Sequence, residues 1–503
     1  MKALLVHPKC PKMTFWSMED IIKKFTDKKA GHIPLALLTV ASMLPEDWIL
    51  KLVDENVKEL TDDDILWANI VLVSAMLIQK KRARKIISRC NELKKTVIAG
   101  GPFFTTCDDE ELKGVDHVLQ GEVEDTMPIF LEDLKKGTAK RIYPSPAKRP
   151  DIKKSPIPKW DLINPGDYVS GAIQSARGCP HDCEFCDVVA MYGKIPRVKD
   201  PEQVIAEIQA LYEAGFRGAI FFADDNLIGN KIMVKKILRQ LIGWQRQYDY
   251  PFHFFTQVSI DLALDDELLG LLRDAGFREV FIGIESVSIE SLEECGKFQN
   301  LKTMRDMPLI DSVKKIQEKY GIQVMVSLII GFDHDPPDNA KRLINFVRRV
   351  KTPIVQLSRL CALRGTRLYN RLKKAGRIKG FATGENTDGY ANIRYSDDVE
   401  KGFDIAFKEV FTTIYSEGEL YERIWNLVKS LPPNTRGRAL NSSGIKTLLK
   451  SLWEIGILGK GRRLLFWKLI AKTLLFSRRN FPVLIKHLIF GEHLMKIAER
   501  FRG

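Results

Sequence analysis

Cysteine is scarce in this 503-residue chain, and long apolar runs are absent. Eight cysteines are too few for a disulfide framework, and three of them fall within eight positions. The first residues reach Pro8 after only a short apolar run, which is unlike a signal peptide. Apolar residues make up 45% of the chain, which excludes a disordered protein. We therefore expect an unexported protein of several domains in a reducing compartment.

Acidic residues number 64 against 78 basic ones, but the formal charge of +14 is unevenly distributed. Residues 460–503 hold eleven basic and two acidic residues, so this tail alone carries +9. The small surplus elsewhere does not indicate nucleic acid, and we expect no such partner. Basic residues also interrupt the apolar runs of the tail before any reaches the roughly 18 residues of a membrane-spanning helix. The tail either lies on an anionic membrane surface or packs on the protein with its lysines in solvent.

Short apolar strands alternate with helical stretches over residues 1–142, which is typical of an open parallel sheet covered on both faces. Ligands of such sheets lie beyond the carboxyl ends of the strands. We expect a Rossmann-like, doubly wound domain here, followed by a linker rich in proline and lysine at 143–160. The predicted strands are 3–7, 48–54, 70–74, 96–99 and 117–120, and the predicted helices are 34–43 and 79–93.

Strand and helix alternate again over residues 161–374, and six strands separated by helices indicate an incomplete, TIM-like (β/α)6 barrel. Residues 375–503 are predicted to be mostly helical and to end in the basic tail. The predicted fold class is therefore α/β, with a doubly wound domain, a partial barrel and a helical extension. The barrel strands are predicted at 171–176, 218–222, 252–258, 279–284, 323–330 and 354–360.

Three thiols stand close together directly after the first predicted barrel strand. Cys179, Cys183 and Cys186 are separated by three and by two residues. A loop this short can hold three thiolates around one inorganic centre, and three ligands would leave one iron of a [4Fe–4S] cube open. The alternative is structural zinc, with a histidine or a distant cysteine as fourth ligand. Such sites usually show a second pair of ligands, which this sequence lacks.

At these residues the chain resembles the radical S-adenosylmethionine superfamily, whose signature is Cys-x-x-x-Cys-x-x-Cys with an aromatic residue before the last cysteine. The resemblance implies that the three cysteines bind three irons of a [4Fe–4S] cluster and that the fourth iron chelates S-adenosylmethionine. It also implies cofactor contacts at the strand ends, with acids for the methionine amino group, a glutamate for the ribose and a glycine motif near the adenine. These residues are Phe185, Asp224, Asp225, Asn226, Gln257, Glu285, Ser327 and Gly331.

An open parallel sheet in front of such a barrel resembles the cobalamin-binding subclass of the superfamily. Short sequence motifs that recur in this subclass occur at residues 31–41, 53–56, 99–102 and 120–122. Glycine at strand ends lets the backbone approach a flat macrocycle or its nucleotide tail closely. The resemblance places the cobalamin edge at Ser74, Gly100, Gly101, Pro102, Gly121 and Glu122.

One signature of cobalamin proteins is missing. The pattern Asp-x-His-x-x-Gly, in which histidine replaces the cofactor's own base below cobalt, does not occur, and neither His7 nor His32 has its surroundings. The resembling subclass commonly lacks it. Two interpretations stay open: cobalamin without a histidine ligand, or a Rossmann-like domain kept for substrate docking or stability. A methylthiotransferase is not expected, because the front-domain cysteines are too widely spread for a second cluster.

Residues 361–369 and 415–423 resemble the helical extension of a cobalamin-binding radical subgroup that includes the hopanoid C2 methylases. We therefore expect a methyltransferase that acts on an unactivated carbon through a 5′-deoxyadenosyl radical and methylcobalamin. Its expected cofactors are a [4Fe–4S] cluster, S-adenosylmethionine and cobalamin. The alternatives are a cyclase, ring-rearranging or oxygen-inserting enzyme with the same cofactors, and a non-enzymatic zinc protein.

The same resemblance implies two kinds of partner. One is a small-molecule or lipid substrate, and the other is an electron donor such as flavodoxin or ferredoxin. The expected location is the cytoplasm, with a peripheral position at the inner face of the membrane if the tail binds lipid.

Overall fold

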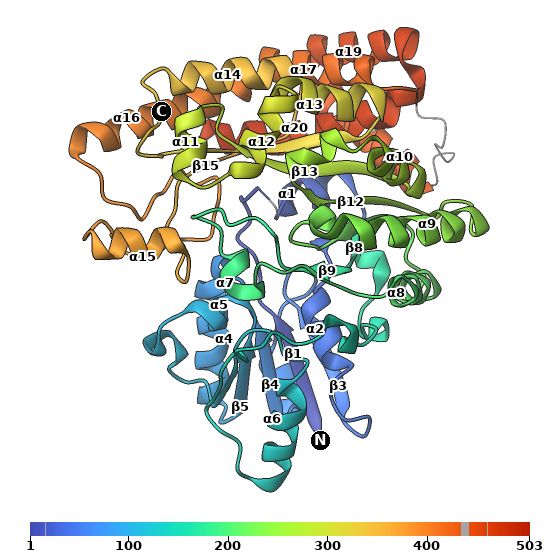
Figure 1. Ribbon diagram of the computed structural model, residues 1–503. Helices are drawn as coiled ribbons and strands as arrows, with labels where there is room; N and C mark the ends of the chain where they lie inside the picture. Colours follow the sequence, from blue (N-terminus) through green and yellow to red (C-terminus); the bar gives the residue numbers. More distant parts are fainter. Residues whose placement is uncertain (16, 434–441, 460, 503) are drawn as a thin grey trace.

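The computed structural model describes residues 1–15, 17–433, 442–459 and 461–502, and it places two parallel sheets one beyond the other (Figure 1). The sheet of the front domain has the order β3-β1-β4-β5-β6-β7, and an apolar cluster on each of its faces forms the core. Its strands are β1 (Lys2–His7), β3 (Ile49–Asp54), β4 (Ile70–Ser74), β5 (Thr96–Gly100), β6 (His117–Leu119) and β7 (Ile142–Tyr143). Its helices are α2 (Leu35–Ala41), α3 (Asp62–Trp67), α4 (Lys80–Glu92), α5 (Pro102–Thr106) and α6 (Thr126–Lys136). The Rossmann-like fold is confirmed.

The second sheet is a parallel half-barrel of order β15-β14-β13-β12-β11-β8-β2. Local sequence signals fix its helices: Pro201 opens α8, and the Asp265 side chain caps α10, which ends at Gly276 in the left-handed conformation. Its strands are β8 (Tyr168–Ile173), β11 (Gly218–Phe222), β12 (Phe252–Val258), β13 (Phe277–Glu285), β14 (Gln323–Ile330) and β15 (Val355–Arg359). Its main helices are α8 (Pro201–Glu213), α9 (Lys231–Gln247), α10 (Asp266–Ala275), α13 (Leu309–Lys314) and α14 (Asn339–Val350). The partial barrel is confirmed.

The first barrel strand ends earlier than its predicted end at residue 176. β8 stops at Ile173, and Ala176 belongs instead to a two-residue strand β9 (Ala176–Arg177), which pairs antiparallel with β10 (Arg197–Val198). The Asp224 carboxylate accepts hydrogen bonds from the backbone N–H groups of Ser175 and Ala176 at 2.7 and 3.0 Å. These bonds turn the chain away from the sheet, and the sequence pattern does not reveal them.

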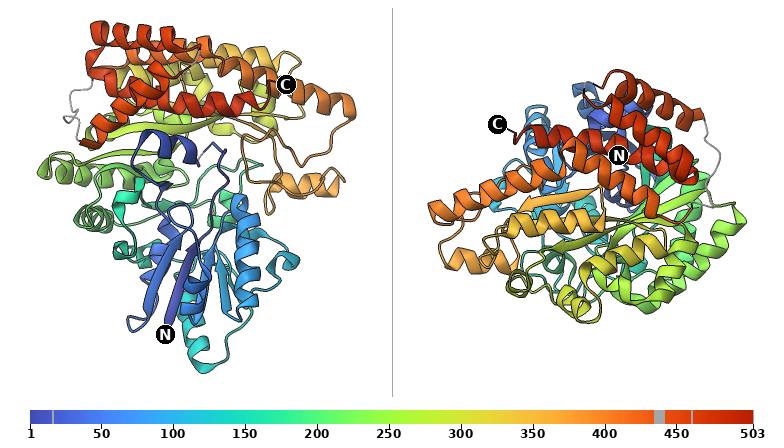
Figure 2. Two further views of the ribbon diagram at one scale, coloured as in Figure 1. Left: turned by 180° about the vertical axis from the view of Figure 1, so that it is seen from behind. Right: turned by 90° about the horizontal axis from the view of Figure 1, so that it is seen from above.

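A further strand, absent from the prediction, joins the barrel from the front domain's part of the sequence. β2 (Ala30–His32) pairs parallel with β8, with His32 opposite Ser170, and becomes the edge of the second sheet. His32 Nδ1 lies 2.7 Å from Ser170 Oγ. Helix α1 (Glu19–Phe25), which precedes it in the sequence, packs against the carboxyl-terminal helix α20 (Phe481–Glu499) (Figure 2).

Residues 375–502 are mostly helical where the structure describes them, as predicted, and one more helix, α15 (Arg367–Lys374), comes directly before them. The last helix lies at the amino-terminal ends of barrel strands: Lys486 pairs with Glu279, and His487 Nε2 lies 2.7 Å from Gln323 Oε1. This helix therefore covers the side of the barrel opposite the carboxyl ends of its strands. Within the described ranges, no helix is both long and apolar enough to span a bilayer. The helices are α15 (Arg367–Lys374), α16 (Asp397–Ile414), α17 (Glu417–Ser430), α18 (Ser442–Ser451), η9 (Leu452–Ile457), α19 (Arg463–Phe476) and α20 (Phe481–Glu499).

Candidate active site between the two sheets

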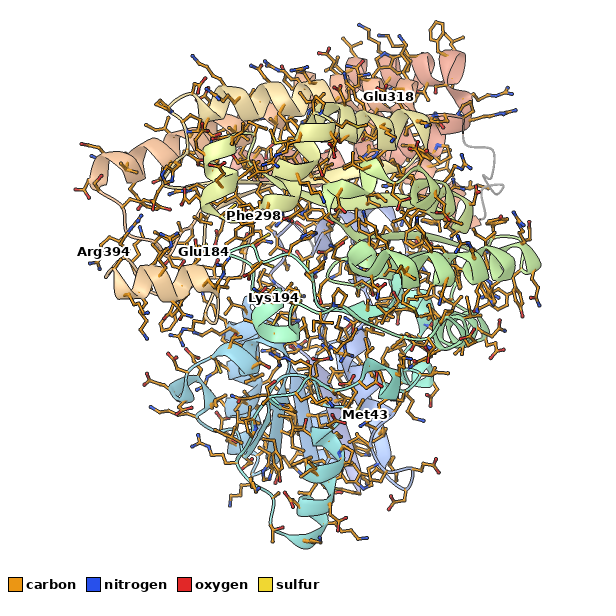
Figure 3. All side chains as sticks on the ribbon, in the orientation of Figure 1. Met43, Glu184, Lys194, Phe298, Glu318 and Arg394 are labelled. Carbon is orange, nitrogen blue, oxygen red and sulfur yellow. The ribbon has the colours of Figure 1, made fainter. Side chains whose placement is uncertain are left out.

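The cysteine loop follows β9 and lies where the barrel meets the front domain. Glu184 and Lys194, within and just after this loop, mark that level (Figure 3). Gly178, just before the first cysteine, has φ +94°, and a Cβ there would come within 2.9 Å of the Gly193 carbonyl oxygen, so only glycine fits. The Cys179 N–H then donates to that same carbonyl at 3.2 Å. Tight backbone packing thus shapes the loop that carries the three thiols.

Two amides contact the sulfur atoms of this loop. Asn226 Nδ2 lies 3.7 Å from the Sγ of Cys179, and Gln299 Nε2 lies 3.5 Å from the Sγ of Cys183. Donors of this kind stabilise thiolate ligands. Asn226 was predicted as a cofactor contact, and the structure places it beside the first cysteine. Gln299, in α12 (Phe298–Asp306), was missed, because nothing in its local sequence indicates the contact.

Asp224 and Asp225 follow β11, where S-adenosylmethionine contacts were predicted. Both oxygens of Asp224 are engaged by Ser175 and by the N–H of Ala176, and Asp225 Oδ2 accepts the Gly178 N–H at 2.8 Å. Burial raises the pKa of Asp224 to about 6 and that of Asp225 to about 7, against these hydrogen bonds. The two acids thus hold the backbone that leads into the cysteine loop.

Glu285 ends β13 in a left-handed conformation, φ +64°, which is uncommon for a residue with a side chain. Its carboxylate is buried between Lys297 Nζ at 2.7 Å and Ser327 Oγ at 2.8 Å. Burial lowers the pKa of Lys297, but the charges of Glu285 and Cys183 outweigh burial and raise it overall. Glu285 and Ser327, both predicted, are thus brought together. Lys297 lies 111 positions after Cys186 and was missed, because no motif surrounds it.

The aromatic residue of the cysteine motif lies beside this ion pair. Lys297 Nζ is 5.9 Å from the centre of the Phe185 ring, which in turn is 6.3 Å from the ring centre of Phe332. Phe332 is buried in the apolar cluster under this site, so packing explains it. The preceding Gly331 has φ +121°, and its N–H donates to Asp335 at 2.8 Å. These residues fix the turn after β14.

A large cavity of about 820 Å³ lies between the carboxyl ends of the two sheets. From the front domain, all six residues predicted for the cobalamin edge line it. From the barrel, Gln257 lines it together with Phe221 and Tyr192. Its volume is in the upper part of the range of small-molecule sites, which is roughly 300–1,000 Å³. The predicted cobalamin-edge residues are Ser74, Gly100, Gly101, Pro102, Gly121 and Glu122.

The cavity extends as an apolar slot along one face of the front sheet. Its walls come from β4, β5 and β6 and from helices α2 and α6 on that face. At the mouth, Gly101 has φ +90°, and a Cβ there would come within 2.8 Å of Ser74 Oγ. Gly121 also has a positive φ, +74°, and a Cβ there would come within 2.4 Å of Ser145 Oγ, which belongs to the segment after β7. The slot is lined by Leu37, Val40, Met43, Leu72, Ile98, Leu119 and Met127.

Glu122 is one of the predicted cobalamin-edge residues, and its carboxylate is already paired. It accepts from Arg177 at 2.9 Å and from Arg197 at 2.7 Å, and Arg177 also pairs with Glu124 at 2.7 Å. The two arginines are register partners in the β9–β10 pair of the barrel, whereas both glutamates belong to the front domain. These partly buried ion pairs therefore join the two domains at the wall of the cavity.

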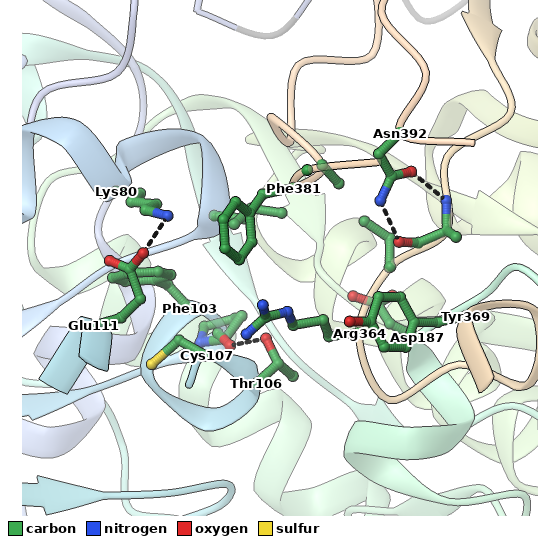
Figure 4. A pocket seen from close by; sticks show the side chains of 16 residues that line it. Lys80, Phe103, Thr106, Cys107, Glu111, Asp187, Arg364, Tyr369, Phe381 and Asn392 are labelled. Carbon is green, nitrogen blue, oxygen red and sulfur yellow. Dashed lines mark hydrogen bonds and ion pairs between the residues drawn. The ribbon is translucent and has the colours of Figure 1, made fainter. Parts of the chain in front are cut away.

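A second seam joins the domains beside α5 (Figure 4). The charged groups of Lys80 and Arg364 each lie 4.6 Å from the centre of the Phe381 ring, which belongs to the segment after α15. Lys80 belongs to the front domain and also pairs with Glu111 at 2.5 Å. Arg364 pairs with Asp108 across the seam. Arg364 thus contacts the front domain.

Two family models match the chain. The radical SAM superfamily matches residues 173–347, and a domain of unknown function, DUF4070, matches residues 366–503. The chain is 36% identical to an uncharacterized methyltransferase of Synechocystis sp., over all of this chain and 93% of that protein. It is 30% identical to the hopanoid C-2 methylase of Rhodopseudomonas palustris, over all of this chain and 94% of the methylase. The chain belongs to the radical S-adenosylmethionine methyltransferase family that contains this methylase.

Solved structures share the fold of this family member. The cobalamin-dependent S-adenosylmethionine radical enzyme OxsB, solved with aqua-cobalamin bound, matches with a TM-score of 0.64 at 14% identity, over 99% of this chain and 80% of OxsB. The radical S-adenosylmethionine methyltransferase TsrM from Kitasatospora setae, with cobalamin and a [4Fe–4S] cluster bound, matches with a TM-score of 0.60 at 15% identity. That match covers 94% of this chain and 99% of TsrM.

The residues of the site can be compared with the [4Fe–4S] cluster and the cobalamin that these solved structures contain. Three thiols on one loop suit a cluster with one open iron. Among the described residues, no three His, Cys, Asp or Glu side chains are arranged as ligands of one metal ion, the three cysteines included, so the fit rests on the spacing of the thiols within one loop. The apolar slot and the close backbone at Gly101 suit a flat macrocycle with a nucleotide tail. His7 Nε2 lies 3.2 Å from Gln79 Nε2, and burial lowers the pKa of this histidine.

Proposed function

We propose that this protein is a cobalamin-dependent radical S-adenosylmethionine methyltransferase that methylates an unactivated carbon of an apolar substrate. The observation that carries the proposal is a large cavity that opens to the carboxyl ends of both sheets. When bound, the cluster would supply the electron that cleaves S-adenosylmethionine, and cobalamin would supply the methyl group. Cys179, Cys183 and Cys186 would hold the cluster, and the apolar slot of the front domain would hold cobalamin.

The barrel residues of the site have distinct tasks in this proposal. Glu285, which Lys297 and Ser327 orient, would supply the carboxylate for the hydroxyls of S-adenosylmethionine when that cofactor is bound. Asp224 and Asp225 hold the backbone before the cysteine loop, so that the thiols keep their positions. The ion pairs of Glu122 with Arg177 and Arg197 keep the two domains in register across the cavity.

The cavity wall supports an apolar substrate. Phe221 and Phe255 stack with ring centres 4.9 Å apart, and His32 lies beside both at 6.0 and 6.2 Å. Burial lowers the pKa of His32 to about 4, so this ring is neutral at pH 7 and contributes no charge. A wall of neutral rings excludes water from apolar carbon atoms and offers little to a charged peptide. The relative at 30% identity is named for a hopanoid, an apolar compound, which supports offering a hopanoid as the first substrate.

The experiment is anaerobic turnover with S-adenosylmethionine labelled in its methyl group. Protein reconstituted with iron, sulfide and cobalamin is reduced with flavodoxin, ferredoxin or dithionite and offered a hopanoid, with a tetrapyrrole and tryptophan as comparisons. We expect 5′-deoxyadenosine and a labelled product from the hopanoid only. Formation of 5′-deoxyadenosine with an unlabelled product would instead indicate the cyclase or ring-rearranging alternative. The Cys183→Ala variant is the control that should form neither compound.

A further inference from the structure

Helix α19 carries apolar side chains on two opposite faces. The inner face is buried in the core of the helical region, through Phe466, Leu469 and Ile470. The outer face also carries apolar side chains, but these lie in solvent. Three of them are at least three-quarters exposed. A helix that is apolar all round is normally buried on all sides or in contact with lipid. The exposed apolar residues of α19 are Leu464 (86%), Trp467 (44%), Leu474 (47%), Leu475 (77%) and Phe476 (75%).

A second exposed stripe runs along α18 and η9. Its members follow one another at intervals of four residues, which places them on one face of a helical segment. The stripe adjoins α19, because the indole N–H of Trp467 donates to the Gly456 carbonyl at 2.9 Å. We call the two stripes together the hairpin face. The members from α18 and η9 are Ile445 (47%), Leu449 (59%), Trp453 (54%) and Ile457 (46%).

The hairpin face is rimmed by positive charge. Arg463, Lys468, Arg478 and Arg479 are exposed along or just after α19, and within the described part of the chain none of them forms an ion pair. The acidic residue of the hairpin, Glu454, is paired with Lys24 at 2.8 Å. Apolar side chains among unpaired cations are complementary to a surface that offers both hydrocarbon and negative charge.

We propose that the hairpin face docks this protein on an anionic lipid bilayer. A second copy of the chain is a poorer occupant, because a self-complementary contact would bring the arginines and lysines of both copies together with no free acid between them. The sequence alone left open whether the whole basic tail binds a membrane or packs on the protein. Within this tail, the structure limits the candidate membrane contact to α19. Helix α20 is largely buried, and its Lys486 and Lys496 pair with Glu279 and Asp20.

The position of the face is compatible with an active enzyme on a membrane. Helix α19 lies at the end of the molecule away from the front domain (Figures 1 and 2). Docking there leaves the seam between the domains uncovered. The proposal requires neither cobalamin nor the cluster, so it can fail or succeed separately from the proposed methyl transfer.

The test is flotation of the full-length protein with vesicles of phosphatidylcholine alone or with added phosphatidylglycerol. We expect binding to the anionic vesicles and little to the neutral ones. The Leu475→Glu/Phe476→Glu variant should lose binding, and Arg478→Glu/Arg479→Glu should weaken it by at least roughly thirtyfold, from about two lost charge contacts. The matched control is Ile232→Glu, which changes a residue on α9 that is 73% exposed and lies outside the hairpin face.

Two further measurements keep the test decisive. Circular dichroism and thermal melting of each variant show whether it folds like the parent. Vesicles with brominated acyl chains should quench tryptophan fluorescence in the parent and less so in Trp467→Phe. The proposal is overturned if folded variants bind as the parent does, or if neutral vesicles bind equally well. It is also overturned if the parent is a stable dimer that ignores vesicles and becomes monomeric in Leu475→Glu/Phe476→Glu.

Discussion

Replacing Lys297 by methionine tests whether the buried ion pair at Glu285 supports the site. The side chains of the pair are only 11% and 6% exposed, and their closest atoms are 2.7 Å apart. Removal of one partner of a buried pair typically costs about 3–5 kcal/mol. We expect the lower end of that range, about 3 kcal/mol, because Ser327 still donates to the remaining carboxylate. For a unit the size of the barrel, this corresponds to a fall of roughly 6–12 °C in the denaturation midpoint.

Two further variants separate stability from binding. Lys297→Met/Glu285→Gln leaves no buried charge, so the unfolding free energy should return to within about 1 kcal/mol of the parent. Binding of S-adenosylmethionine, measured by equilibrium dialysis on protein with intact cluster, should stay weak in both variants. Lys113→Met removes an ion pair whose side chains are 70% and 83% exposed, and it should change little. If Lys297→Met melts no earlier than this control, the pair has no structural role and the reasoning fails.

Three other predictions concern the cofactors and the domain joint. Cys183→Ala should fold but lose bound iron after anaerobic reconstitution, whereas replacement of the buried Cys90 by alanine should keep the iron. Gly101→Ala should be destabilised by about 1–3 kcal/mol and should bind less cobalt when cobalamin is supplied, because its Cβ would crowd the strand end. Gly137→Ala has a similar positive φ but open space around it, so its cobalt content should equal that of the parent. Glu122→Ala should cost about 3 kcal/mol and split thermal melting into two transitions, which a single transition at the parent's midpoint would contradict.

The periodicity of the sequence was sufficient to predict both sheets, because each buried strand of a parallel sheet reads as a short apolar run. The cysteine spacing was sufficient to predict the cluster loop. The periodicity was wrong about the end of the first barrel strand. The turn there depends on the carboxylate of Asp224, which follows the next barrel strand, β11. Hydrogen bonds between distant parts of a chain leave no local pattern in the sequence.

The same limit explains which site residues were missed. Lys297 and Gln299 follow a loop with no recognisable motif, and only the packing of α12 under the cysteine loop brings them to Glu285 and Cys183. The edge strand β2 was missed because three residues are too short for a periodic signal. Its partner β8 lies more than a hundred positions away in the sequence.

The basic tail shows why composition alone could not decide between a membrane and the protein as its partner. Helices α19 and α20 share the same mixture of leucine, phenylalanine and lysine, yet α20 places His487 and Leu488 under the barrel while α19 leaves Leu475 in solvent. The difference arises from the elements around each helix: α20 lies between α1, α17 and the barrel strands, so both its sides are covered. Helix α19 has protein on one side only. A membrane test must therefore target α19 and its neighbour η9 rather than the tail as a whole, because α19 is the tail helix that leaves large apolar side chains in solvent.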